Sequence, residues 1–127
     1  MTNVVLDSSA LLAYLNGEPG AEMVAGIIAD SLISSVNLAE TITKLVERSG
    51  SLEAARAVLD VVELDVRDFD RALAERTGEL VTRTRRSGLS LGDRACLALA
   101  AREGVPAITA DRSWAALEID VQVRLIR

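Results

Sequence analysis

The sequence contains no histidine, and this excludes several kinds of active site. Ser/His/Asp and Cys/His nucleophilic arrangements both need an imidazole as the general base. Histidine is also the commonest metal ligand among side chains, so histidine-ligated metal centres are excluded too. Any catalytic chemistry must therefore rest on carboxylates, hydroxyls, arginines or bound metal ions.

Cysteine and lysine are each represented by a single residue, Cys96 and Lys44. One cysteine allows neither a disulfide within the chain nor a thiolate zinc cluster, which fits a reducing cytoplasm. Lys44 stands in a predicted helix with Glu40 four residues before it and Glu47 three residues after it. That spacing favours a surface ion pair over a catalytic role.

Acidic residues outnumber basic ones by 19 to 14, for a formal net charge of −5. Nucleic acid could be attracted only by a local basic patch or through bound cations. No apolar stretch approaches the roughly 20 residues of a membrane span, and the residues before Asp7 lack the basic segment followed by an apolar run that is typical of an export leader. We therefore expect a cytoplasmic protein that does not bind membranes.

Aromatic residues are also scarce, although 50% of the residues are hydrophobic. The core must be built mainly from aliphatic side chains. A chain of 127 residues has the size of one domain. We predict a single domain over residues 1–127.

Short apolar runs alternate with segments of helical spacing along the chain. Residues 3–7, 32–35 and 105–111 are typical of buried strands, whereas 61–66 and 119–126 alternate like half-buried edge strands. One long helix is predicted between Asp68 and about Arg86. Strands separated by helices predict an α/β domain with a mainly parallel central sheet and helices on both faces.

Acidic residues end two of the predicted strands. Asp7 ends strand 3–7, and Asp111 ends strand 105–111. Because parallel strands end at one common edge, where ligands bind in open α/β sheets, both carboxylates are expected there. Each also has a structural explanation, as the cap of the helix or turn that follows.

Two more acids stand three residues after predicted helix caps: Glu40 after Asn37, and Asp93 after Ser90. Both pairs match a capping box, in which the third carboxylate accepts from the cap's own amide. Taken singly, each acid fits a structural role. Four carboxylates at one edge would nevertheless repel one another strongly without cations. Mg²⁺ and Mn²⁺ prefer oxygen ligands, so either ion suits this set.

The stretch LSLGDRACLALA places Asp93 in line with Cys96, Leu97 and Ala100, on what should be the apolar face of a helix. A carboxylate there needs a partner, and a metal ion where the helix begins would supply one. Cys96 has no base beside it, which favours a core position over a nucleophilic role.

A family resemblance follows from four motifs in order: VVLDSSALLAYL, AETITKL, LSLGDRACLALA and ITADRSW. They resemble the successive motifs of the PIN-domain ribonucleases, and the chain is most similar to the VapC-type toxins of bacterial toxin–antitoxin pairs. The likeness covers essentially the whole chain. It implies a compact three-layer α/β/α domain that cleaves RNA endonucleolytically with one or two Mg²⁺ or Mn²⁺ ions.

The resemblance also implies site residues. The ions would be held, and water activated, by Asp7, Glu40, Asp93 and Asp111. Ser9 and Thr109 match the hydroxyl residues that orient acids or water in such sites. Thr109 has a separate reason, because residues two apart on a strand face one side, which puts its hydroxyl beside Asp111. Ser113 and Trp114 stand where some members carry a further acid.

Arginines are the candidates for gripping the RNA backbone. These are Arg112, beside the last acid, and the run Arg83, Arg85 and Arg86, which could equally be a solvated helix end. By resemblance we also expect a VapB-type antitoxin as partner, and a homodimer.

Other classes of protein also gather acids at such an edge. A phosphoacceptor receiver domain would be expected to place a lysine near a later strand end, and Lys44 is not so placed. An aspartate-nucleophile phosphatase usually has a second Asp where Ser9 stands. A noncatalytic binding domain would use the acids only as caps or as a cation-binding edge, and this alternative stays open.

Overall fold

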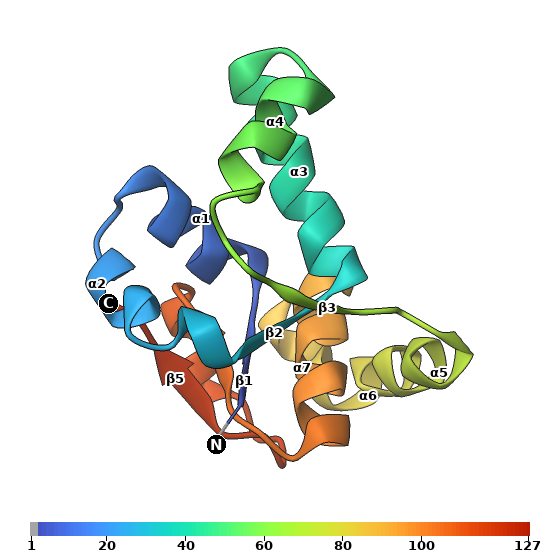
Figure 1. Ribbon diagram of the computed structural model, residues 1–127. Helices are drawn as coiled ribbons and strands as arrows, with labels where there is room; N and C mark the ends of the chain where they lie inside the picture. The colour runs from blue at the N-terminus through green and yellow to red at the C-terminus, as the bar shows by residue number, and fades with distance from the viewer. Residues whose placement is uncertain (1–2) are drawn as a thin grey trace.

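The computed structural model describes residues 3–127 and has a central sheet whose strands all run parallel (Figure 1). The strands are β1 Val4–Leu6, β2 Ser31–Ser34, β3 Asp65–Arg67, β4 Ala107–Thr109 and β5 Val123–Leu125. They lie in the order β3-β2-β1-β4-β5. The predicted parallel sheet is confirmed, and its edge strands are β3 and β5, which lie within or overlap the two alternating segments. The bounds predicted for the first of them are wrong, since only residues 65 and 66 of 61–66 belong to β3. The chain is still turning after α4 there, and the Val62 N–H donates to the Leu59 carbonyl at 3.0 Å.

The order of strands reverses beside β1. The chain runs outward from β1 through β2 to β3, and then returns to place β4 on the other side of β1. Ligands bind at such a reversal, outside the carboxyl ends of the strands, because the connections there leave in opposite directions. The end of β1 is followed by Asp7, and β4 ends with Thr109.

Helices cover both faces of the sheet and give three layers (Figure 1). They are α1 Ser8–Asn16, α2 Ala21–Ala25, α3 Ser35–Ser49, α4 Leu52–Leu59, α5 Arg71–Glu79, α6 Val81–Thr84 and α7 Leu91–Glu103. Three 3₁₀ segments complete the chain: η1 Ile28–Asp30, η2 Arg85–Ser87 and η3 Arg112–Ala116.

The core lies on both sides of the sheet because neighbouring strand residues point to opposite faces. Val4 and Leu6 pack with α1, whereas Val5 packs with α7. The middle of helix α7 is enclosed, with every side chain from Ala95 to Ala100 buried. Its small residues let it lie close to β1 and to its neighbours α3 and α5.

The prediction of a single helix between Asp68 and about Arg86 is wrong. Asp70 caps α5 by accepting from the backbone N–H of Leu73, so the helix begins there. The segment then divides into α5, α6 and η2, and Thr84 leaves helical geometry at φ −119°, ψ 5°. Asp70 offers a capping carboxylate that competes with continued helix, which explains the late start.

No helix within residues 3–127 is long and apolar enough to cross a membrane.

Candidate active site at the carboxyl edge of the sheet

Asp7 is held rigidly between β1 and α1. It is 4% exposed, and it caps α1 as predicted, with Oδ1 accepting from the Ala10 backbone N–H at 2.8 Å. The Ser9 hydroxyl donates to the same oxygen at 2.7 Å, and the Thr109 hydroxyl donates to Oδ2. Since Thr109 comes from β4, this last bond spans the reversal in strand order beside β1.

Burial raises the pKa of Asp7 to about 6, from an ordinary value of 3.8. The hydrogen bonds from Thr109, Ser9 and Ala10 oppose that rise, and the nearby charge of Asp93 adds to it. A charged Asp7 is therefore costly in this position. Such a cost is typical of a functional acid, and a bound cation would remove it.

Glu40 has no capping role, contrary to the capping box predicted from Asn37. Helix α3 begins at Ser35, and its cap is Ser34, whose hydroxyl accepts from the Val36 backbone N–H at 3.2 Å. The helix starts early because β2 runs straight into it. Glu40 instead accepts through Oε1 from the Ser8 hydroxyl at 3.2 Å and from Asn37 Nδ2 at 3.0 Å.

Asp93 does form the predicted capping box. Its Oδ2 accepts from the Ser90 backbone N–H at 3.0 Å, and the Ser90 hydroxyl accepts from the Asp93 N–H at 3.1 Å. The box uses only one carboxylate oxygen. Asp93 also lies near enough to Asp7 to raise its pKa.

Cys96 shows that three of the acids converge. Its thiol is fully buried, and its pKa is raised well above the ordinary value, first by burial and then by the charges of Asp7, Asp93 and Glu40. A thiol with a raised pKa is a poor nucleophile, so Cys96 belongs to the core as predicted. Helix α7 thus carries both the buried Cys96 and Asp93, and the Glu40 carboxylate lies against Gly92 on the same helix.

Asp111 is the most exposed of the predicted acids. It caps η3, and its Oδ1 accepts from the Ser113 backbone N–H at 3.0 Å and from the Ser113 hydroxyl at 2.7 Å. The Thr109 hydroxyl accepts from the Asp111 backbone N–H at 3.0 Å. Thr109 therefore lies beside Asp111 as predicted, although the carboxylate that it binds is that of Asp7.

The donor set fits a hard divalent cation in its chemistry. Glu40, Asp93 and Asp111 each have one oxygen tethered by a protein donor and one without such a donor among residues 3–127. Untethered carboxylate oxygens are the ligands that Mg²⁺ and Mn²⁺ prefer. As the side chains stand, no group of three or more acidic or thiol side chains in this part of the chain is close enough to hold one ion. The acids therefore form a convergent set of ligand donors but not a closed site.

Gly92 is a site residue that the sequence analysis missed. A Cβ built on it would lie 2.3 Å from Glu40 Oε2 and 2.4 Å from Oε1. Only glycine lets the Glu40 carboxylate rest against α7 at this point. The one sequence signal was a glycine inside a predicted helix, directly before Asp93.

We expect Gly92→Ala to displace the Glu40 carboxylate and to lower the RNA cleavage that the family resemblance implies by about 10- to 100-fold, as for other residues that position a site's ligands. The free energy of unfolding should change by less than about 1 kcal/mol, because the clashing group is the far end of a flexible side chain and alanine favours helix. Gly78→Ala is the matched control, since nothing lies within 4 Å of a Cβ there. Equal cleavage by both variants would contradict the role of Gly92.

The predicted basic residues form no ion pair with the four acids within residues 3–127. Arg83, Arg85 and Arg86 line an exposed hollow of about 380 Å³ together with Thr82, and Arg83 lies 3.7 Å from Asp120. Arg112 is exposed, and its Nε donates to the carbonyl of Arg127 at 3.3 Å. The ion pair predicted for Lys44 is not formed with any residue between 3 and 127.

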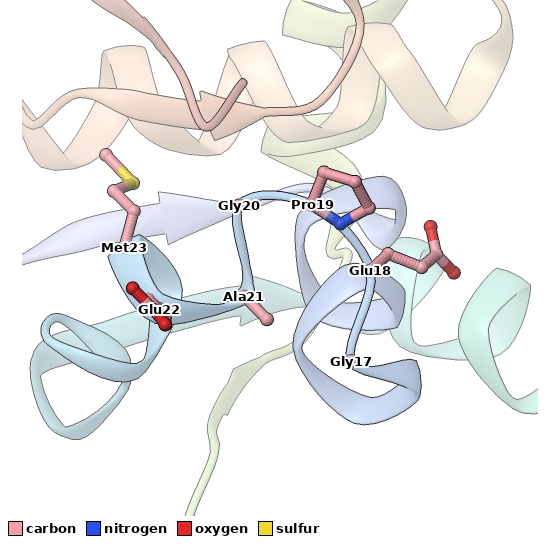
Figure 2. Close-up of a pocket in the computed structure, with 7 residues that line it drawn as sticks. All are labelled: Gly17, Glu18, Pro19, Gly20, Ala21, Glu22 and Met23. Atoms are coloured by element: carbon pink, nitrogen blue, oxygen red, sulfur yellow. The ribbon is translucent and has the colours of Figure 1, made fainter.

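A larger hollow of about 660 Å³ lies at the turn between α1 and α2 and is lined by residues 17–23 (Figure 2). Figure 2 shows Glu18 and Met23 at opposite ends of this turn. None of the predicted acids lines it. The chemistry therefore centres on the sheet edge and not on this hollow.

Comparison with known proteins places the chain in a family. A family model of the PIN domain matches residues 4–119. The chain belongs to the PIN-domain family. Ribonuclease VapC of Mycolicibacterium smegmatis is 33% identical to this PIN-domain chain over 115 residues, which cover 81% of the chain and 87% of the relative.

Solved structures share the same fold. VapBC-5 from Mycobacterium tuberculosis, a member of the VapBC family of toxin–antitoxin systems, matches with a TM-score of 0.67 and 26% identity, over 100% of this PIN-domain chain and 99% of that one. VapBC2 from Rickettsia felis, solved bound to a DNA fragment from its promoter, matches with a TM-score of 0.76 and 20% identity over 98% of each chain. The predicted PIN-like α/β/α fold and the predicted resemblance to VapC-type toxins are thus confirmed.

Proposed function

We propose that this PIN-domain chain is a metal-dependent endoribonuclease and the toxin of a VapBC-type toxin–antitoxin pair. The observation that carries the proposal is the gathering of three acids at the reversal in strand order. Glu40 accepts from Ser8, the neighbour of Asp7, and its carboxylate lies against Gly92, the neighbour of Asp93. The relative named Ribonuclease VapC supports the choice of RNA as substrate. A receiver-type alternative is not favoured, since Lys44 is exposed on α3.

In this proposal Asp7, Glu40, Asp93 and Asp111 hold Mg²⁺ or Mn²⁺. When bound, the ion lowers the pKa of water and stabilises the charge that develops on the phosphate. Ser9 and Thr109 fix both oxygens of Asp7 and keep its carboxylate facing the edge of the sheet. The capping box of α7 fixes one oxygen of Asp93 and leaves the other free to act.

Arginines supply the contacts to the RNA backbone. Arg83, Arg85 and Arg86 line one hollow, and Arg85 and Arg86 form no ion pair within residues 3–127. Three guanidinium groups around one depression suit phosphate groups. We assign Arg112, next to Asp111, a supporting role in binding the RNA backbone.

The proposal extends to the wider setting of the protein. We assign residues 1–127 to one nuclease domain that acts in the cytoplasm as a homodimer and binds a VapB-type antitoxin. The similar structures from Rickettsia felis and Mycobacterium tuberculosis are VapBC proteins, and this supports the proposal of such a partner.

Removal of metal ions tests the function. Purified protein should cut a mixture of bacterial transfer and ribosomal RNA in Mg²⁺ or Mn²⁺, stop in excess EDTA, and resume when Mn²⁺ is restored. Gel electrophoresis of the RNA gives the result. Full cleavage in EDTA, or none in either metal, would overturn the proposal.

A further inference from the structure

Asn37 joins two helices at the candidate site. It lies on α3, is 1% exposed, and donates through Nδ2 to Glu40 Oε1 and to the carbonyl oxygen of Gly92 on α7, each at 3.0 Å. These acceptors fix the orientation of the amide, because the flipped amide would set its own oxygen against theirs. One side chain thus ties the Glu40 carboxylate to the helix that carries Asp93.

The other end of the same amide has no partner. Oδ1 of Asn37 is buried and accepts no hydrogen bond from residues 3–127. A buried acceptor without a donor lowers stability, and an apolar side chain of similar size would avoid that loss. The Gly92 carbonyl lies in the first turn of α7, where the helix supplies its own donor. Stability alone therefore does not favour asparagine at this position, which indicates a role in the site.

We propose that Asn37 is a positioning residue, whose amide holds Oε1 of Glu40 so that Oε2 stays free to act in the site. Three residues constrain the Glu40 carboxylate. Asn37 Nδ2 and the Ser8 hydroxyl hold Oε1, and the bare backbone of Gly92 admits the carboxylate group. This inference rests on the proposed function, since it assigns Glu40 a role in cleavage.

The first test compares Asn37→Leu with wild type. We expect kcat to fall by about 10- to 100-fold with KM within about threefold, while resistance to urea stays equal or rises. Thr41→Val is the matched control, because Thr41 is buried one turn further along α3 and its hydroxyl donates only to the Asn37 backbone carbonyl. It should lower resistance to urea and leave kcat unchanged.

The second test asks whether Asn37 acts through Glu40. Calorimetry with Mn²⁺ should show that Asn37→Leu weakens binding about tenfold in the wild-type background, but less than twofold in a Glu40→Gln background. Equal weakening in both backgrounds would show that Asn37 acts independently of Glu40 and would overturn the proposal.

The outcomes separate this inference from the function itself. If wild type cleaves RNA and Asn37→Leu cleaves at the same rate, the positioning role is wrong and the function stands. If wild type does not cleave RNA, the proposed function fails. The positioning role of Asn37 would then stand only if Mn²⁺ binding shows the coupling to Glu40 and the resistance of Asn37→Leu to urea is equal to wild type or higher. Without both results, that role is wrong as well. Lower resistance to urea in Asn37→Leu, with kcat reduced only in proportion to the folded fraction, would assign Asn37 a merely structural role.

Discussion

Asp7→Asn is expected to abolish RNA cleavage and, at the same time, to make the metal-free protein more stable at pH 7. Cleavage is lost because the carboxylate at the reversal in strand order is gone. Stability rises because the buried charge of Asp7, whose pKa is raised to about 6, is removed. The shift from 3.8 corresponds to roughly 3 kcal/mol at neutral pH.

The hydrogen bonds around Asp7 can survive this substitution. An amide oxygen can still accept from Ala10 and Ser9, and the Thr109 hydroxyl has a second acceptor in the Ser9 oxygen at 3.3 Å. Because some bonding is nevertheless lost, we expect a net gain of about 1–3 kcal/mol.

The stability gained by Asp7→Asn should increase as pH rises. Well below pH 3.8, Asp7 is protonated in both the folded and the unfolded chain, so wild type carries almost no penalty there. As pH rises from about 4 to about 6, the unfolded chain loses its proton first, and the folded wild type becomes relatively less stable. Urea unfolding at pH 3.5 and pH 7.5 measures this difference. A folded variant that cleaves at the wild-type rate, or one that is less stable at pH 7.5, would contradict the assignment.

The second prediction concerns the chemical groups at the ends of the RNA fragments. A ribonuclease that activates the RNA 2′-hydroxyl commonly uses histidine or lysine as acid and base and leaves a cyclic 2′,3′-phosphate. This chain has no histidine, and its only lysine, Lys44, is exposed on α3. Attack by water on phosphorus would instead expel the 3′-oxygen, so we expect a 5′-phosphate and a 3′-hydroxyl.

Mass spectrometry of fragments from a short RNA identifies these ends. A matched RNA with a 2′-deoxy residue at the cut site is the control, and it should still be cut. A cyclic phosphate would refute hydrolysis by water. Loss of cutting in the control alone would point to recognition of the 2′-hydroxyl, because RNA-binding proteins use that group to distinguish RNA from DNA.

Local rules sufficed for the features that depend on a few neighbouring residues. Asp7 capping α1 and Ser90 forming a box with Asp93 were both predicted, since a cap is decided by residues three apart. The parallel sheet followed from strands separated by helices. The position of the acids at one edge then followed from topology.

Contacts between helices could not be predicted in this way. Ser34 and Asn37 are both good caps by residue type, and only the direct entry of β2 into α3 decides for Ser34. The close approach of Glu40 to Gly92 depends on how α3 packs against α7, which no local spacing encodes. The role of Asn37 was missed for the same reason. The part of the site that was not predicted is therefore the part built from cross-helix contacts.

The most direct test of the account is calorimetric titration of Mn²⁺ into the purified protein, its Asp93→Asn variant and the Gly78→Ala control. Asp93→Asn keeps an oxygen for the Ser90 amide, so α7 should remain capped and the variant folded. We predict saturable binding by wild type and Gly78→Ala, and binding at least tenfold weaker in Asp93→Asn. Equal affinity in all three, or no binding by wild type, would contradict the claim that these acids form a metal site.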